Sequence, residues 1–206
     1  FFVIDTYLDK LWRQNLSLSN QIFKTKQIEA LLSLNYQFNE NHSMGARFNW
    51  EKTPESYWSV NQFAQTFSGN QLYEDLHSNV VGNEPEGYRK ANFYYSGKVK
   101  NWSIDFNADG LWSDAENTQV AEEEILGGIN EAVNRSVTTF DTKKNELYAA
   151  KLVVSHPLAK GNLSFGGEYS HNKRNTTYFN EEGVIANDEA MIKEGATSAF
   201  IEYAKA

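Results

Sequence analysis

Apolar and polar residues alternate with a period of two along much of this 206-residue chain. From Ala30 to Phe38 the even positions are apolar or aromatic, while the odd positions between them are mostly polar. After a polar break at 39–42, the alternation resumes from Met44 to Trp50. A period of two places successive side chains on opposite faces of a strand. The pattern therefore predicts an antiparallel hairpin with a tight polar turn.

The same alternation predicts further strands, roughly eight in all. Two more hairpins are expected, one through the Lys100-Asn101 turn and one through a turn at 157–161. The opening strand is expected to pair with one that begins near Leu16 and runs into the strand at Ala30. The remaining predicted strands cover 1–8, 90–99, 102–109, 146–156, 162 to about 178, and about 196–205.

The connections between these strands are expected to alternate in length. Short turns fall at 39–42, 100–101 and 157–161, whereas long polar connections are predicted at about 54–89, 115–143 and 179–194. Outer-membrane barrels have short periplasmic turns and long extracellular loops, and a soluble sandwich has no need for this rhythm. The chain is therefore predicted to be all-β, an antiparallel up-and-down transmembrane β-barrel of which it forms about eight strands.

Strand lengths and aromatic residues agree with a membrane barrel. The chain has no apolar run of about 18 residues, so a transmembrane helix is excluded, but alternating runs of roughly 9–11 residues suffice for a spanning strand. Aromatic residues make up 14% of the chain, and those near strand ends fit an interfacial girdle. The expected girdle residues are Trp50, Trp58, Tyr94, Tyr95, Trp102, Trp112, Tyr169 and Tyr178.

Charge and cysteine content exclude several classes of function. The net charge is -8 and no run of Lys or Arg exceeds two residues, so nucleic acid is not an expected partner. With no Cys, disulfides and thiolate chemistry are ruled out. Both ends read as strand interiors, so residues 1–206 are expected to be part of one larger barrel, of about 22 strands. The remaining strands would lie outside this sequence.

Two blocks resemble the barrel of TonB-dependent receptor-like outer-membrane proteins of the Bacteroidetes. They are the strand-turn-strand segment 94–109 (YYSGKVKNWSIDFNAD) and the segment 195–205 (GATSAFIEYAK). The resemblance runs from about residue 27 to the end and rests on the general character of the residues and on the order of the blocks. It implies uptake of a ligand through a plugged barrel in the bacterial outer membrane. The implied partners are outer-membrane lipid, the remaining barrel strands, a plug domain that is absent from residues 1–206, a TonB-type energy-coupling protein and a surface lipoprotein.

One sequence motif matches a calcium-binding loop. Asp105, Asn107, Asp109 and Glu116, with Gly110, have the spacing of an EF-hand. The residues before Asp105 alternate with period two, which indicates a strand where an EF-hand needs a helix. The match is therefore interpreted as accidental, and no metal site or cofactor is predicted.

The acidic run Glu122-Glu123-Glu124 lies in a predicted long connection. Its spacing with Ile125, Leu126, Ile129 and Val133 predicts a short amphipathic helix with a solvated face. A cation-bridged contact to lipopolysaccharide is the alternative interpretation.

Ligand contact is expected in the connection at 54–89, because aromatic planes and amide groups suit sugars and other large polar ligands. Ordinary loop packing and girdle aromatics are the competing interpretation. The candidate ligand-binding residues are Tyr57, Trp58, Phe63, Phe67 and Tyr73.

No catalytic constellation is found, and the four His residues are scattered, so no enzyme activity is predicted. An outer-membrane enzyme barrel is therefore disfavoured. The main alternative to a receptor or transporter is a soluble or surface-attached β-sandwich that binds carbohydrate. The two hypotheses differ in where the apolar faces point: outward to lipid in a barrel, or toward each other in a sandwich. The residues that decide this are Leu32, Leu34, Phe48, Phe93, Phe106 and Leu152.

Overall fold

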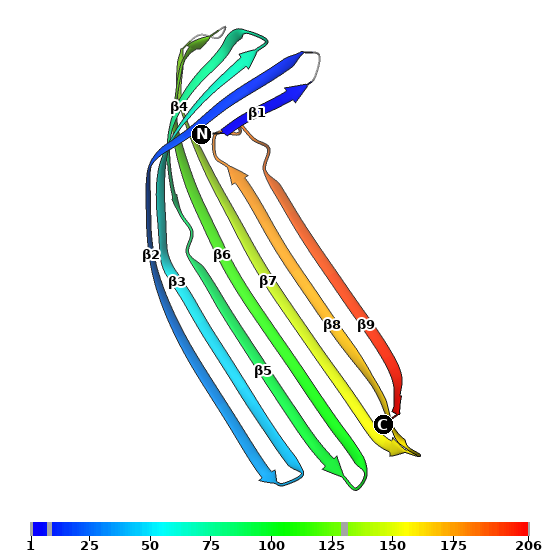
Figure 1. The fold of residues 1–206 in the computed structure, drawn as a ribbon. Coiled ribbons are helices and arrows are strands. Elements are labelled where there is room, and N and C mark those ends of the chain that lie inside the picture. Colours follow the sequence, from blue (N-terminus) through cyan, green and yellow to red (C-terminus); the bar gives the residue numbers. More distant parts are fainter. Residues whose placement is uncertain (1, 8–9, 129–131, 206) are drawn as a thin grey trace.

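The computed structural model describes residues 2–7, 10–128 and 132–205, which form one antiparallel sheet of nine strands (Figure 1). Within these residues no helix is long and apolar enough to cross a bilayer. The strands are β1 (Phe2–Tyr7), β2 (Leu11–Asn39), β3 (His42–Ser68), β4 (Gln71–Asn83), β5 (Glu86–Val99), β6 (Trp102–Gly128), β7 (Val133–Leu158), β8 (Gly161–Asn180) and β9 (Asp188–Lys205).

The strands follow an up-and-down order, each next to its sequence neighbour, with β4 and β5 sharing one position between β3 and β6. Both run antiparallel to β6 in one continuous register, from Leu76↔Ile125 to Val99↔Trp102. Pro85 separates them, because a proline has no N–H to donate to the ladder. Nine strands thus occupy eight positions, which agrees with the roughly eight strands predicted.

The three short turns lie together at the lower end of the sheet in Figure 1. The turns at 40–41, 100–101 and 159–160 agree with the predictions. Lys100 and Ala159 adopt positive φ angles of 56° and 53°, the left-handed conformation that a tight turn requires. The N–H of Asn41 donates to Oδ1 of Asn39 at 2.8 Å and closes the first turn.

The prediction of long polar connections at 54–89, 115–143 and 179–194 is largely wrong. β3 and β4 continue through the first region to a turn at Gly69-Asn70, and β6 and β7 fill most of the second. In the third region only 181–187 lies outside the strands. The predicted helix at 122–133 is also wrong where the structure describes it, because Glu122 to Gly128 belong to β6. Ile129 of that predicted helix lies outside the described residues.

The error has a physical cause. Hydrophobic alternation reveals a strand only where one face is apolar and the other polar. The upper parts of β6 and β7 have polar residues on both faces at several positions, so the period-two signal fades. Their backbones nevertheless pair continuously, from Ser103↔Ser155 to Ile125↔Val133. Most residues of the expected long connections therefore belong to strands that extend the sheet at its upper end.

The lower part of the sheet has one apolar and one polar face, which the register defines. Phe93 and Ala46 are cross-strand neighbours, as are Phe106 and Leu152, so these side chains share the apolar face. On β6 the apolar face carries the even positions from Trp102 to Trp112. This region of about eleven residues is called the apolar belt below, and matches the roughly 9–11 residues of a membrane-spanning strand.

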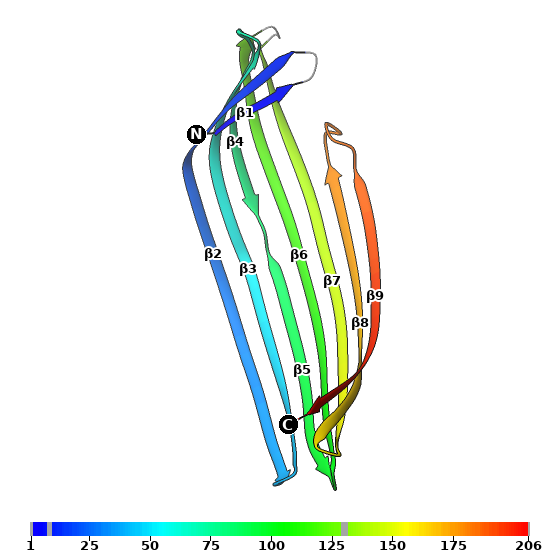
Figure 2. The same ribbon diagram turned by 45° about the vertical axis from the view of Figure 1, so that its right-hand side comes forward.

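No protein layer covers the apolar belt in the described part of the chain, and its large side chains are well exposed. Figures 1 and 2 show one layer of long inclined strands. Leu34 is 63% exposed, Leu32 59% and Leu152 44%. A sandwich would bury these side chains under a second sheet. The apolar faces therefore do not meet one another, and the fold is that of a curved barrel wall.

Above the apolar belt the sidedness of the sheet inverts. Four apolar residues of the upper part are buried and only 1–9% exposed: Ala64, Val80, Ala121 and Ile125. Val80 pairs with Ala121, and Leu76 lies between Ala64 and Ile125. Ala121 and Ile125 are odd positions of β6 and thus lie on the polar face, opposite the belt. The register of β6 and β7 is unbroken, so no bulge accounts for the change in these two strands, whereas the register of β3 against β2 shifts between Lys52 and Glu55. Both faces of one strand therefore change character along its length.

Gly45 provides a test of packing on the polar face. A Cβ at Gly45 would overlap the ring of Tyr94, whose hydroxyl donates to Oδ1 of Asn35 at 2.9 Å. Gly45→Val is expected to displace the ring, break this hydrogen bond and destabilise the fold by about 1–3 kcal/mol. Urea unfolding followed by tryptophan fluorescence measures the change.

Gly195→Val is the matched control, because a Cβ there meets nothing closer than the Ser170 carbonyl oxygen at 3.9 Å. It is expected to change stability by no more than about 0.5 kcal/mol. Equal unfolding midpoints for the two variants would contradict the packing described at Tyr94.

Candidate functional site: the polar face and the upper end of the sheet

Directly behind the apolar belt, the polar face carries a network of side-chain hydrogen bonds. Asn92 on β5 donates to Asn107 and to Asp109 on β6, both at 2.9 Å. The hydroxyl of Ser96 donates to Asp105 at 2.7 Å. These amide, hydroxyl and carboxylate groups are half-exposed or exposed, which suits a face in contact with water.

A groove of about 380 Å³ lies on this polar face. Arg47 and Lys90 provide two cations there, and Asp109 one anion. Within the described residues neither cation has a carboxylate within the 4.0 Å of an ion pair. Charges and amides in such an arrangement suit a polar ligand or another protein segment. The groove is lined by Arg47, Asn49, Tyr88, Lys90, Asn92 and Asp109.

A larger hollow of about 680 Å³ lies at the upper end of the sheet, across β3, β4, β6 and β7. Phe63 and His77 meet edge to face there, with ring centroids 4.7 Å apart. Ser136 donates its hydroxyl to Glu122 at 3.0 Å, and Arg135 pairs with Glu123. The acidic run is therefore part of a strand whose carboxylates are partly satisfied by the neighbouring strand.

The candidate ligand-binding residues predicted from the sequence are not gathered in one loop. They all lie in strands, and they divide between the two faces of the sheet. Trp58 lies against Gly82 and Tyr73 against Trp12, with ring centroids 5.0 Å apart, on the polar side. Tyr57, Phe63 and Phe67 alternate with Trp58 along β3 and lie on the opposite side. Only Phe63 lines the upper hollow, so a single aromatic ligand platform is not formed.

The predicted aromatic girdle is also divided. Trp50, Tyr95, Trp102, Trp112 and Tyr169 lie on the apolar face. At the upper edge of the belt, Nε1–H of Trp112 donates to the hydroxyl of Tyr148 at 2.9 Å. At the lower edge, the Trp102 ring lies 4.4 Å from that of His156. Trp58, Tyr94 and Tyr178 lie on the polar face, so their assignment to the girdle is wrong.

The residues of the calcium-loop match all lie in β6. The predicted strand is confirmed for Asp105, Asn107 and Asp109, whereas Glu116 was expected in a connection. Asp105, Asn107 and Asp109 follow one another on the polar face, whereas Glu116 has the opposite parity and lies on the other face. They therefore do not surround a common point. Within residues 2–7, 10–128 and 132–205, no group of three His, Cys, Asp or Glu side chains is placed to hold a metal ion.

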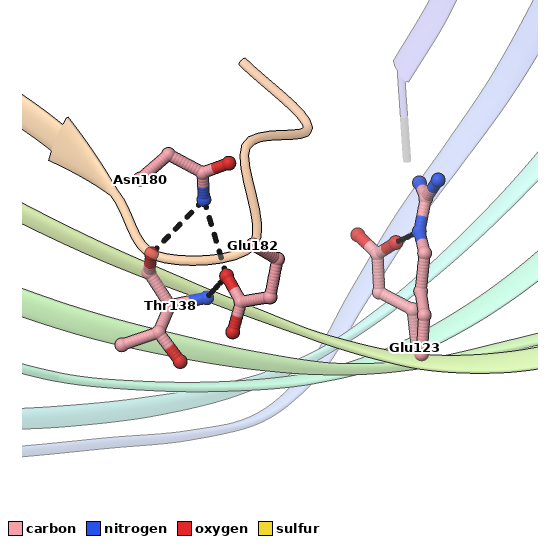
Figure 3. Close-up of polar contacts among 5 residues, drawn as sticks. Glu123, Thr138, Asn180 and Glu182 are labelled. Atoms are coloured by element: carbon pink, nitrogen blue, oxygen red, sulfur yellow. Dashed lines mark hydrogen bonds and ion pairs between the residues drawn. The ribbon is translucent and has the colours of Figure 1, made fainter. Parts of the chain in front are cut away.

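A hydrogen-bonded clasp, which sequence reasoning did not find, holds the connection at 181–187 against β7 (Figure 3). The carboxylate of Glu182 accepts the backbone N–H of Thr138 at 2.7 Å and the amide of Asn180 at 3.3 Å. Asn180, only 2% exposed, also donates to the Thr138 carbonyl at 2.9 Å. The Thr138 N–H holds the pKa of the Glu182 carboxyl below its ordinary value.

No family model matches this chain, and no curated protein matches it. Among solved structures, a loop L8 deletion mutant of OmpT, an outer membrane protein of Vibrio cholerae, aligns with 8% sequence identity and a TM-score of 0.12. The alignment covers 91% of this chain and 99% of that one. A likeness at this level carries no argument, so the architecture rests on the pairing and exposure of this chain's own strands.

The clasp makes the upper end of the sheet sensitive to acid. Because the pKa of Glu182 is lowered in the folded state, its contribution is present at neutral pH and is lost as the pH falls through that lowered value. The hydrogen-exchange protection factor of the Thr138 amide is therefore expected to fall in acid. Glu182→Gln is expected to lower this protection at neutral pH and to remove its dependence on pH. Wild-type protection in Glu182→Gln would show that the carboxylate does not hold the clasp.

Proposed function

We propose that this chain forms part of the wall of an outer-membrane receptor or transporter barrel for ligand uptake. In this proposal the apolar belt meets lipid, and the polar face lines the interior of the barrel. The observation that carries the proposal is the uncovered apolar belt in a single-layer sheet whose opposite face is a polar hydrogen-bonded network. Such a layer suits a boundary between hydrocarbon and water.

The inversion of sidedness supports a membrane boundary at the upper edge of the belt. Within the belt, apolar side chains point away from the proposed barrel interior, as lipid requires. Above it, Asn79, Glu122 and Ser136 are exposed on the outer side, while Val80 and Ala121 are buried on the inner side. That is the arrangement of a protein surface in water. A strand that leaves a bilayer would change its surroundings in this way.

The open sheet supports a larger barrel. Within the described residues β9 pairs with β8 alone, and no strand joins it to β1 or β2. In hydrocarbon, every backbone N–H and C=O needs a protein partner, so a membrane wall has to close through further strands. The proposed partners are these strands, outer-membrane lipid and a plug domain against the polar face. The groove at Arg47, Lys90 and Asp109 offers charged groups to such a plug or to a polar ligand.

Energised uptake follows from the resemblance to TonB-dependent receptors rather than from a site in this sheet. The proposal includes a TonB-type energy-coupling protein and a surface lipoprotein as further partners on that ground. The alternative, a carbohydrate-binding sandwich, would need a second sheet over Leu32, Leu34 and Leu152. Leu32 and Leu34 are more than half exposed, and Leu152 is also exposed.

Quenching by brominated lipid tests the proposal. The protein is expressed into the outer membrane of a Gram-negative host, purified, and reconstituted with phospholipid brominated on its acyl chains. In a variant with Trp102 as its single tryptophan, strong quenching is expected because the ring lies on the lipid side of the belt. A variant with Trp58 as its single tryptophan is the control, since this ring lies level with Gln119, above the upper edge of the belt, and is expected to escape quenching.

Two outcomes would refute the proposal that this sheet is a barrel wall. Unquenched fluorescence from Trp102 in a folded protein would mean that protein covers the apolar face, as in a sandwich. Equal quenching of both variants would mean that acyl chains also reach Trp58 above the belt, which is incompatible with a membrane boundary at Trp112.

A further inference from the structure

Three lysines lie close together on the lipid side of the sheet, where the apolar belt ends. Lys173 of β8 and Lys193 of β9 are direct cross-strand neighbours. Glu146 of β7 lies directly between Trp112 of β6 and Lys173 of β8, so Lys173 is level with the upper aromatic edge of the belt. Lys144 of β7 lies one alternate position higher on the same face, beside Asp114. The cluster thus starts at the height at which lipid headgroups would replace acyl chains.

The pairing of Lys173 with Lys193 is unfavourable by itself. Like charges placed directly opposite on neighbouring strands destabilise a sheet. Among the described residues, none of these three lysines has a carboxylate within 4.0 Å. Glu146 is the cross-strand neighbour of Lys173, although no ion pair within 4.0 Å joins them among the described residues, and Asp114 pairs with Lys52 at 3.7 Å. One carboxylate beside two ammonium groups leaves the Lys173 and Lys193 pair with a net positive charge. An anion held between the two ammonium groups would relieve the repulsion.

Further cations occur along the same upper edge. Arg89 of β5 lies between Trp50 and Trp112 on the apolar face, and Lys52 of β3 lies just above. At the lower edge, the last row of the belt has no Lys or Arg; it consists of Val99, Trp102, His156, Leu163 and Tyr203. Lys205 lies one alternate position below this row on the same face, and Lys100 and Lys160 lie in the turns, so cations border both edges of the belt. The upper edge differs in that it has the direct Lys173 and Lys193 pair, and it belongs to the end of the sheet with the long extensions, which faces outward in a barrel.

We propose that Lys144, Lys173 and Lys193 bind the phosphate of a phosphorylated glycolipid in the outer leaflet. This inference rests on the proposed function, because it needs lipid against the apolar belt. Ammonium groups bind phosphate through charge-assisted hydrogen bonds, and basic residues at a membrane surface favour anionic lipid. The belt beneath would hold the acyl chains of the same molecule. The acidic residues Glu122 and Glu124 lie farther up the sheet and take no part in this contact.

Native mass spectrometry of the full protein in detergent tests the site. The probes are lipid A and lipid A from which the phosphates have been removed. Wild-type protein is expected to retain phosphorylated lipid A preferentially. Lys173→Gln combined with Lys193→Gln is expected to weaken that binding roughly tenfold or more, because each basic residue near a membrane surface favours anionic lipid. The corresponding pair of Lys→Arg substitutions is expected to keep it, since the charges remain.

Lys151→Gln is the matched control, since Lys151 lies in β7 on the polar face and is expected to leave lipid A binding unchanged. The same double Gln variant is expected to be more heat-stable than wild type in detergent free of anionic lipid, where the like charges only repel. Wild-type retention of lipid A by the double Gln variant would overturn the inference, as would equal binding of the dephosphorylated lipid. Full displacement of lipid A by inorganic phosphate would also overturn it, because the lysines would then bind a free anion and not a lipid.

The outcomes separate this inference from the function on which it rests. If Trp102 is quenched by brominated lipid but the double Gln variant keeps lipid A, the wall stands and only the headgroup site fails. If Trp102 is not quenched in the folded protein, both fail together.

Discussion

Every feature of this protein depends on the backbone hydrogen-bond ladder of a sheet that stands as a single layer. A soluble sheet hides its apolar face under a second sheet or helices, and the buried layer stabilises the fold. Here the described residues supply no such layer, and residues such as Leu34 and Leu152 remain exposed. The cross-strand pairing from β1 to β9 therefore holds the structure together, and something other than this sheet has to cover the belt. Lipid on one face and water on the other satisfy both requirements at once.

The sequence predicts the part of the fold in which the two faces differ. Between Ala30 and Trp50, and again from Ala91 to Ala108, alternation gives the correct strands, the correct partners and the correct turns. It fails above Trp112, because Asn117, Thr118 and Gln119 are all polar and conceal a strand that continues to Gly128. Composition cannot distinguish a polar loop from a polar strand. The information lies in the partner strand, whose register is fixed lower down by the belt.

The candidate site was predicted less well, and for a related reason. Tyr57, Trp58 and Phe63 are close in sequence, which suggests a shared loop, but a strand sends neighbouring residues to opposite faces. Conversely, Lys144, Lys173 and Lys193 are far apart in sequence and become neighbours only through pairing across β7, β8 and β9. The clasp of Glu182 and Asn180 on Thr138 is equally invisible in the sequence. Sites on a meander are built across strands, so their members are separated by about one hairpin length.

The central claim is that the same strand leaves lipid at the upper edge of the belt. The most direct measurement is a scan of single spin-labelled cysteines along β6 in reconstituted bilayers, which the absence of native Cys makes possible. The accessibility of each label to oxygen, which concentrates in lipid, is expected to oscillate with period two, with maxima at even positions from Trp102 to Trp112. Beyond Trp112 the lipid signal is expected to end, while labels at Glu122 and Glu124 meet water-soluble reagents. An oscillation absent from the belt, or one that continues in the same phase through Glu124, would contradict this account.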